Sequence, residues 1–250
     1  MISINNLNYT IGSSQVLTDI SVRIPKGGMT ALIGPNGAGK STLLSHIARL
    51  LPIQRGQIEV DDLEVGKCDE RTLAKRLAIL PQQVHFATRL TVRDMVTFGR
   101  YPHSQGRVTE SDRKIVAQAL EVFGLTDLED RFLDTLSGGQ RHKAHVAMTY
   151  AQDTDYLLLD EPLNNLDIAA ARNLMTLLKN LADHRGKTIV IVLHDINFAA
   201  QYADHLLVMQ NGTVAQEGRP TNLITETLLK DVFGTDARVA LVDDTPVVLP

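Results

Sequence analysis

Four short apolar runs stand out along the chain, at residues 29–33, 77–80, 156–159 and 188–193. Each has the length of a β-strand and is rich in β-branched or aliphatic side chains. None of them alternates clearly with polar residues, which is typical of strands that are buried on both faces. The runs therefore predict a parallel sheet that is covered by helices on its two sides.

Residues with chemical uses follow the four runs. They are Gly34, Gln82, Asp160 with Glu161, and His194. Because ligands of open α/β sheets bind at the carboxyl ends of the strands, this coincidence predicts one shared site. A single histidine at the end of a strand is more often an ordinary surface side chain, but the shared position favours a functional role for His194.

The segments around these strands follow other patterns. Residues 1–24 alternate apolar and polar side chains on either side of a Gly-Ser turn, which predicts a small antiparallel sheet with one solvated face. Between residues 84 and 153 the strand signal fades, and residues 109–123 fit an amphipathic helix capped by Thr109. We therefore expect an α/β fold, with a parallel-sheet core, an N-terminal antiparallel β subdomain and an inserted helical subdomain.

The length of the chain favours one domain, over residues 1–250, rather than two independent domains. We expect the core and the β subdomain at residues 1–83 and 154–215, and the helical subdomain at 84–153. Residues 216–250 form a C-terminal extension in which a helix and a short hairpin are expected. The sequence assigns no chemistry to this extension.

Composition and charge narrow the classes of partner. A net charge of -4 and a pI near 6.0 argue against a basic face for nucleic acid, so no nucleic-acid partner is expected. No apolar run approaches the length of about 18 residues that a membrane span needs, and the N-terminus has no pattern of a secretory signal. Cys68 is the single cysteine and suits a reducing compartment, so we expect the chain in the cytosol.

A glycine-rich loop, GPNGAGKST, follows the first core strand and precedes a segment that fits a helix. This is the pattern G-x-x-x-x-G-K-[ST] in the context of a phosphate-binding loop, which predicts a P-loop NTPase core. Backbone N–H groups of the loop and the N-terminus of the helix would bind the phosphates of ATP. Lys40 would reach the β- and γ-phosphates, and the Ser41 hydroxyl would bind Mg²⁺. The expected ATP-binding residues of this loop are Gly34, Pro35, Asn36, Gly37, Ala38, Gly39, Lys40, Ser41 and Thr42.

Two adjacent carboxylates end the third core strand. We expect Asp160 to hold Mg²⁺, directly or through water, and Glu161 to orient and polarise an attacking water. An acidic strand end in a solvated turn would be the better interpretation without Lys40. With Lys40 upstream, the pair favours nucleotide hydrolysis.

Six motifs in one order make the chain resemble the ATP-binding cassette subunits of ABC transporters over essentially its whole length: GPNGAGKST, LPQQ, LSGGQ, YLLLDE, NNLD and LHD. The resemblance implies an ATPase in which Glu161 is the catalytic base, His194 is the switch histidine and Gln82 contacts both Mg²⁺ and the attacking water. It also implies that Tyr9 stacks on adenine, with a plain sheet tyrosine as the alternative, and that Asp167 lies at a dimer seam.

LSGGQ resembles the signature motif of this family. The resemblance implies that this motif faces the ATP held by a second copy of the chain, so that two ATP molecules lie between two protomers. A glycine turn that caps a helix is the alternative. The signature residues expected to meet the partner's ATP are Ser137, Gly138, Gly139 and Gln140.

Some positions near these motifs are less typical of the family. Asn164 and Asn165 depart from its commoner residues in this segment, which leaves the turnover rate open. His142 and His145 are expected to be surface and packing residues, because no carboxylate or cysteine ligand lies near them in sequence. We can place Arg141, His142 and Lys143 on a helix but assign them no task.

The segment LTVRDMVTFGRYPH at residues 90–103 resembles importers of ferric siderophores, haem and cobalamin, and DEPLNNLD is similar to a variant in catecholate siderophore importers. The resemblance implies a homodimer beneath two permease subunits, with an extracytoplasmic binding protein as an indirect partner. It also implies a peripheral position at the cytoplasmic face of the plasma (inner) membrane. Haem or cobalamin import, a soluble ABC protein and a regulatory ATP-binding module are the alternatives.

Overall fold

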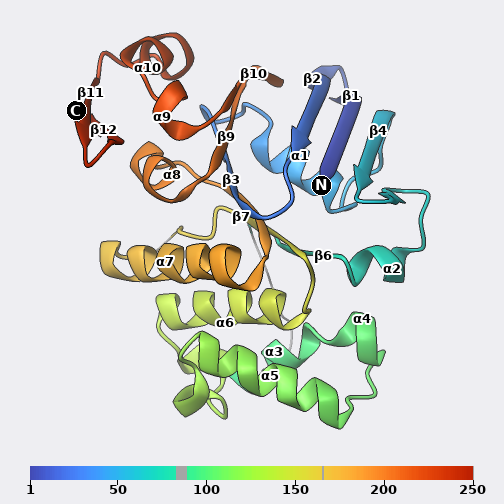
Figure 1. Ribbon diagram of the computed structural model, residues 1–250. Helices are drawn as coiled ribbons and strands as arrows, with labels where there is room; N and C mark the ends of the chain where they lie inside the picture. The colour runs from blue at the N-terminus through green and yellow to red at the C-terminus, as the bar shows by residue number, and fades with distance from the viewer. Residues whose placement is uncertain (83–88, 165, 250) are drawn as a thin grey trace.

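The computed structural model describes residues 1–82, 89–164 and 166–249. All four predicted core strands are present in this part of the chain, where they are neighbours in a six-stranded sheet and pair in parallel. The prediction of a parallel core is therefore confirmed (Figure 1). The four strands are β3 (Gly28–Ile33), β6 (Leu77–Leu80), β7 (Tyr156–Asp160) and β8 (Thr188–Val192).

Two further strands extend this sheet, and the four apolar runs did not include them. β9 (His205–Gln210) pairs in parallel with β3, and β10 (Thr213–Gly218) pairs antiparallel with β9, which gives the order β10-β9-β3-β8-β7-β6. Asn211 and Gly212 join the two strands, both with positive φ. An Asn-Gly pair is a strong sequence signal for such a two-residue hairpin turn, so the signal for these strands was present.

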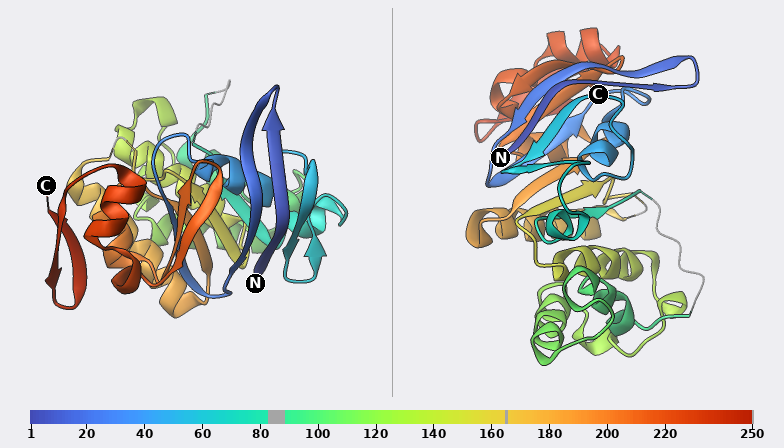
Figure 2. Two further views of the ribbon diagram at one scale, coloured as in Figure 1. Left: turned by 90° about the horizontal axis from the view of Figure 1, so that it is seen from above. Right: turned by 90° about the vertical axis from the view of Figure 1, so that its right-hand side faces the viewer.

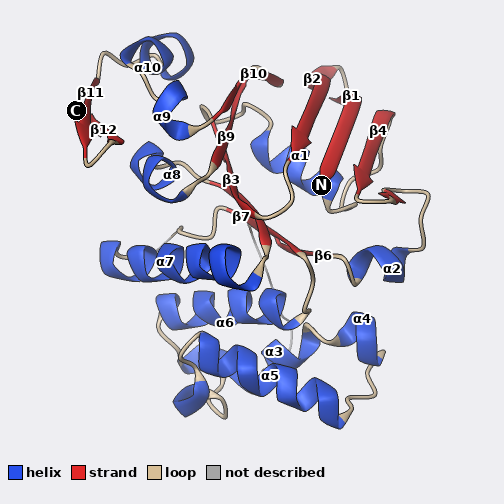
Figure 3. Ribbon diagram, in the orientation of Figure 1, coloured by secondary structure: helices blue, strands red, loops and turns tan. Residues whose placement is uncertain are grey.

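Alternate residues of each core strand face two different hydrophobic cores. In β3, Ala31 and Ile33 belong to the core shared with α7, α8 and the helical lobe, whereas Leu32 belongs to the core shared with α1 and the antiparallel sheet. Figure 3 shows helices on one side of the sheet and α1 with red strands on the other. Burial on both faces explains why the runs do not alternate with polar residues. The helices are α1 (Lys40–Ile47), α7 (Ile168–Arg185) and α8 (Ile196–Tyr202).

The predicted antiparallel sheet is also present, and within the described residues its strand order is β2-β1-β4-β5. The first two strands lie where the alternation placed them, whereas the last two were not predicted. A short helix, α2, follows this sheet and leads into β6. The elements are β1 (Ile2–Ile11), β2 (Ser14–Ile24), β4 (Arg55–Val60), β5 (Leu63–Glu64) and α2 (Glu70–Ala74).

A helical lobe is inserted between β6 and β7, as predicted, and Figure 2 shows it at the end of the molecule opposite the antiparallel sheet. The expected helix at 109–123 is α5, which begins after a capping box formed by Thr109 and Asp112. The exact domain boundaries stay a prediction. The lobe contains α3 (Val92–Phe98), α4 (Tyr101–Ser104), α5 (Glu110–Val122), α6 (Gly138–Ala151) and the 3-10 turns η1 (Thr126–Leu128) and η2 (Leu133–Thr135).

The C-terminal extension has the helix and the hairpin that the sequence predicts. After a short helix, α9 (Pro220–Leu223), the chain forms α10 (Glu226–Phe233). The hairpin consists of β11 (Arg238–Val242) and β12 (Thr245–Leu249), which pair antiparallel with each other. The extension returns toward α8, at the left of Figure 1.

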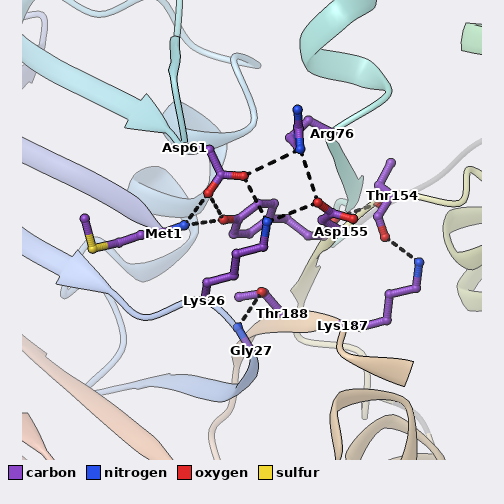
Figure 4. A network of polar contacts seen from close by, with 10 residues as sticks. Met1, Lys26, Gly27, Asp61, Arg76, Thr154, Asp155, Lys187 and Thr188 are labelled. Carbon is purple, nitrogen blue, oxygen red and sulfur yellow. Dashed lines mark hydrogen bonds and ion pairs between the residues drawn. The ribbon is translucent and has the colours of Figure 1, made fainter. Parts of the chain in front are cut away.

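A polar network ties the antiparallel sheet to the amino end of β7 (Figure 4). The Asp61 carboxylate accepts hydrogen bonds from the Met1 amino group and from the Tyr156 hydroxyl, each at 2.5 Å, and from Lys26 at 3.3 Å. Burial acts to raise the pKa of Asp61, but these donors outweigh it and lower the pKa to about 2. The network therefore fixes the amino end of β7, on the opposite side of the six-stranded sheet from the carboxyl ends of its parallel strands.

A buried ion pair holds the helical lobe together. The Arg100 guanidinium contacts Asp112 at 2.9 Å and donates to the Ala151 carbonyl at 2.8 Å, so it links the α3–α4 junction to α5 and α6. Both side chains of the pair are only 5% exposed. Hydrogen bonds from Thr109 lower the pKa of Asp112, burial opposes them, and Arg100 lowers it further, to about 2. The arginine of the GRYPH segment is therefore a structural residue.

We expect Asp112→Ala to lower the free energy of unfolding by about 3 kcal/mol, because it leaves Arg100 buried without its counter-charge. Glu110→Ala is the matched control, since it breaks an exposed pair with Arg113 and should change stability by less than about 1 kcal/mol. Because folding lowers the pKa of Asp112, its contribution is complete above the unfolded pKa of about 3.9 and is lost as the pH falls toward 2. Denaturant titrations at several pH values measure the free energy of unfolding of both variants. Equal destabilisation by Asp112→Ala and Glu110→Ala would contradict the role of the buried pair.

Candidate functional site

The phosphate loop joins β3 to α1 in a conformation that needs glycine. Gly34 has a φ of 146°, and a Cβ there would lie 2.0 Å from the Met209 carbonyl oxygen of β9. Gly39 has a φ of 98° and precedes the first residue of α1. The Lys40 ammonium bends back over the loop and donates to the carbonyls of Gly34 and Pro35, at 2.8 and 2.9 Å. The loop is thus closed around a cation, and its glycines let the backbone turn.

Asp160 and Ser41 meet beside this loop. Asp160 is the last residue of β7, and its carboxylate accepts a hydrogen bond of 2.8 Å from the Ser41 hydroxyl at the start of α1. Asp160 is buried. The two side chains provide the oxygen ligands that Mg²⁺ prefers, of the kind that bind it together with the oxygens of substrate phosphates. They were predicted to hold the metal, and the structure brings them together.

Glu161 is surrounded by donors from three segments. One carboxylate oxygen lies 2.7 Å from Nε2 of His194, and the other accepts hydrogen bonds from the side-chain amides of Gln82 at 2.8 Å and Asn164 at 2.6 Å. Glu161 has a φ of 52°, an uncommon value for a residue with a side chain. Strained backbone of this kind clusters at functional sites. From the sequence, Glu161, His194 and Gln82 were expected in one site, whereas Asn164 stood out only as a departure from the family.

Burial and hydrogen bonding push the pKa values of the two neighbouring carboxyls in opposite directions. Burial raises the pKa of Asp160, and the hydrogen bond from Ser41 offsets only part of the effect. Burial also acts to raise the pKa of Glu161, but the bonds from His194, Asn164 and Gln82 outweigh it and leave the pKa below its usual value. Glu161 is therefore ionised at neutral pH and able to accept a proton.

The phosphate loop, Glu161 and His194 line a cavity of about 220 Å³ at the carboxyl edge of the sheet. The phosphate loop from Asn36 to Thr42 forms one wall, and Glu161 and His194 form the other. Val16, at the start of β2, also lines the cavity and was not predicted. It comes from the antiparallel sheet, which no motif connects to the phosphate loop in the sequence.

The signature segment forms a second cavity, of about 310 Å³. Ser137 caps α6 in a capping box with Gln140, so this helix N-terminus is well formed. Asp167 caps α7 by accepting a 2.7 Å hydrogen bond from the Ala170 N–H. The second cavity shares no lining residue with the phosphate cavity. Its lining residues are Ser137, Gly139, Gln140, Lys143, Leu166, Asp167 and Ala170.

Stacking on adenine would require an exposed aromatic ring, but the Tyr9 ring is buried. It is 9% exposed, and its ring makes a T-shaped contact with the His46 ring, with centroids 4.4 Å apart. This placement favours the alternative, a sheet tyrosine that packs in the core; stacking on adenine stays a prediction. Ile11, two residues further along the same face of β1, is 57% exposed instead.

The residues after LSGGQ now have positions. The Arg141 guanidinium donates to the Leu133 carbonyl at 3.1 Å, and Lys143 lines the signature cavity. His142 and His145, which were expected to be surface and packing residues, are half-buried, and burial lowers both pKa values, that of His145 to about 4. In the described part of the chain, no cluster of three or more His, Cys, Asp or Glu side chains could hold a metal.

Two parts of the expected site region lie outside the described residues. Residues 83–88, at the expected start of the helical subdomain, are one part, and Asn165, a departure in the segment before Asp167, is the other. Gln82, Asn164 and Asp167 on their flanks are described. Among the described helices, none has both the length and the apolar composition that a membrane crossing requires.

Comparison with known proteins places the chain in a family. Residues 17–164 match the family described as ABC transporter. A petrobactin import ATP-binding protein of Bacillus subtilis (strain 168) is 47% identical over 98% of this chain and 97% of its own length. A ferric enterobactin transport ATP-binding protein of Escherichia coli (strain K12) is 38% identical, with coverages of 98% and 92%.

Solved structures agree with these matches. A chain of a metal-chelate type ABC transporter in an inward-facing conformation has a TM-score of 0.85 at 27% identity, covering 100% of this chain and 97% of its own. A dimeric ATP-binding cassette with bound ADP and Pi has a TM-score of 0.77 at 27% identity, covering 88% and 98%. The chain therefore belongs to the ATP-binding subunits of the ABC transporter family and is an ABC ATPase.

Proposed function

We propose that this chain is the ATP-hydrolysing subunit of an ABC importer that takes up an iron-siderophore complex through a partner permease. The observation that carries the proposal is the convergence of the phosphate loop, Asp160 and the Glu161–His194 pair at one edge of the sheet. The chain in which they converge is similar, over nearly all its length, to subunits named for siderophore import.

The relatives also suggest which substrate to test first. Two relatives named for petrobactin import are 47% and 48% identical to this chain, whereas those named for hydroxamate import and enterobactin transport are each 38% identical. Ferric petrobactin is therefore the first candidate, ahead of haem and cobalamin. The catecholate class suggested by DEPLNNLD stays a prediction.

In the proposed reaction, the phosphate loop and the N-terminus of α1 bind the phosphates of ATP, and Lys40 neutralises part of their charge. Ser41 and Asp160 would hold Mg²⁺, and Gln82, whose amide donates to Glu161 at 2.8 Å, is proposed as a further ligand. The bound metal would supply positive charge to neutralise the charge that develops on the transferred phosphoryl group. Glu161 accepts a proton from the attacking water, and His194 orients its carboxylate.

We expect Glu161→Gln to keep ATP binding, because the amide has the shape of the carboxylate, but to slow phosphate release by at least about 100-fold. Uptake of ⁵⁵Fe-labelled petrobactin should stop when this variant replaces the natural chain in cells. Nucleotide binding, phosphate release and uptake are measured side by side, with Glu64→Gln on β5, which does not line the cavity, as the control. Normal phosphate release by Glu161→Gln would refute the base assignment. Loss of haem or cobalamin uptake, with petrobactin uptake intact, would refute ferric petrobactin as the substrate.

We also propose that two copies of the chain bind two ATP molecules between them. Within one chain, the signature cavity has no lining residue in common with the phosphate cavity, although Ser137 and the N-terminus of α6 form a second anion cradle. Each copy would then contribute the phosphate loop to one ATP site and the signature segment to the other. ATP favours the closed dimer because only its γ-phosphate bridges both cradles.

We expect Ser137→Arg to bind ATP normally as a monomer but to fail to dimerise with ATP, because the long side chain fills the cradle. Ser137→Ala is the matched control: it removes the N-cap at a cost of about 1 kcal/mol without filling the cavity. Light scattering of both variants, each combined with Glu161→Gln, measures the dimer. ATP-dependent dimerisation by Ser137→Arg would exclude the shared site.

The permease is proposed to dock on the helical lobe. An apolar hollow of about 330 Å³ lies there, lined by Leu90, Phe98, Tyr101 and Val108 together with Asp94. The two aromatic side chains are 49% and 62% exposed. Exposed aromatic residues around a hollow are typical of surfaces that bind a protein partner. We propose a cytoplasmic helix of the permease as the occupant, with the chain held at the inner face of the membrane by this contact.

We expect Tyr101→Ala to leave the ATPase activity of the isolated protein unchanged but to reduce copurification with the permease and siderophore uptake by at least about tenfold. Leu50→Ala, which truncates an exposed leucine outside the lobe, should change neither. Pull-down with the permease and uptake assays measure the two effects. Wild-type copurification of the Tyr101 variant would rule out this docking surface.

A further inference from the structure

The C-terminal hairpin is attached to α8 by a side chain. The Asn197 amide donates to the Val248 carbonyl at 3.1 Å, and its oxygen accepts from the Val248 N–H at 2.8 Å. An asparagine side chain has one donor and one acceptor group on the same carbon, as a peptide group does. Asn197 therefore pairs with β12 as a neighbouring strand would, on the edge that β11 does not occupy.

Asn197 lies in the first turn of α8, directly after the residues that form the catalytic edge. Asp195 caps this helix by accepting hydrogen bonds from the N–H groups of Asn197 at 2.8 Å and Phe198 at 3.3 Å. His194, the residue before the cap, contacts Glu161 at 2.7 Å. A displacement of the first turn of α8 would therefore reach His194 within three residues.

The hairpin itself is anchored firmly enough to hold this turn. Val239 and Val248 pack against the main hydrophobic core, together with Phe198 of α8. The Val239 N–H also donates to the Glu226 carboxylate of α10, at 3.4 Å. Leu241, near the tip of the hairpin, is exposed. Val239 and Val248 thus fix the middle of the hairpin to the body of the protein.

We propose that the hairpin β11–β12 is a strap that holds the first turn of α8 and so positions His194 against Glu161. In this proposal Asn197 is a positioning residue, because it acts through His194 and does not line the phosphate cavity. The inference rests on the proposed role of His194 in hydrolysis. It gives the C-terminal extension a function within the ATPase cycle.

The test compares Asn197→Ala with Asn222→Ala, which truncates an exposed asparagine on α9 in the same extension. We expect Asn197→Ala to lower kcat for ATP about threefold to tenfold with an unchanged KM, since the phosphate loop is not affected. Asn197→Asp keeps an acceptor for the Val248 N–H and should retain part of the activity. Asn222→Ala should change neither constant. An unchanged kcat in Asn197→Ala would overturn the proposal.

A double-mutant cycle separates positioning from a general loss of stability. In a His194→Ala background, Asn197→Ala should have no further effect on kcat, because the residue that it positions is absent. Multiplicative losses in the double variant would show that Asn197 acts independently of His194 and would overturn the proposal. If His194→Ala alone leaves kcat unchanged, the proposed role of His194 fails, and the positioning role falls with it. If only the Asn197 effect is missing, the proposed function stands.

Discussion

The site depends on the register of three parallel strands, β3, β7 and β8. Val192 of β8 lies opposite both Leu32 of β3 and Asp160 of β7, so the three strands end at the same height. A slip of one residue moves a strand by about 3.3 Å. Such a shift exceeds the 2.7 Å contact between His194 and Glu161, so a single register error would separate these two side chains.

Two adjacent carboxyl residues at the end of β7 have different surroundings. Asp160 still belongs to the strand, is buried, and has Ser41 as its hydrogen-bond donor. Glu161 leaves the strand through a left-handed backbone turn and meets donors from three segments. Environments that separate the pKa values of neighbouring carboxyls also separate their roles. The turn at Glu161 therefore separates the residue proposed to hold the metal from the residue proposed to accept the proton.

The sequence predicted what depends on local pattern and missed what depends on packing between distant segments. The four buried runs, the phosphate loop and the helix caps at Thr109 and Ser137 carry their signals within a few residues. Val16 reaches the phosphate cavity only through the folded chain, whereas Asn164 lies three residues from Glu161 and stood out only as a departure from the family. Tyr9 could have been placed better, because it shares its alternation phase with the buried Leu7.

The division of each core strand between two hydrophobic cores has a consequence for how this protein can evolve. Ala31 and Leu32 are neighbours in sequence, yet one packs with the helical side and the other with α1 and the antiparallel sheet. A change of volume at one of them must be compensated on its own side of the sheet. Among homologues, substitutions at residues i and i+2 of a strand, which face the same core, should therefore covary. Substitutions at adjacent residues, which face different cores, should occur independently.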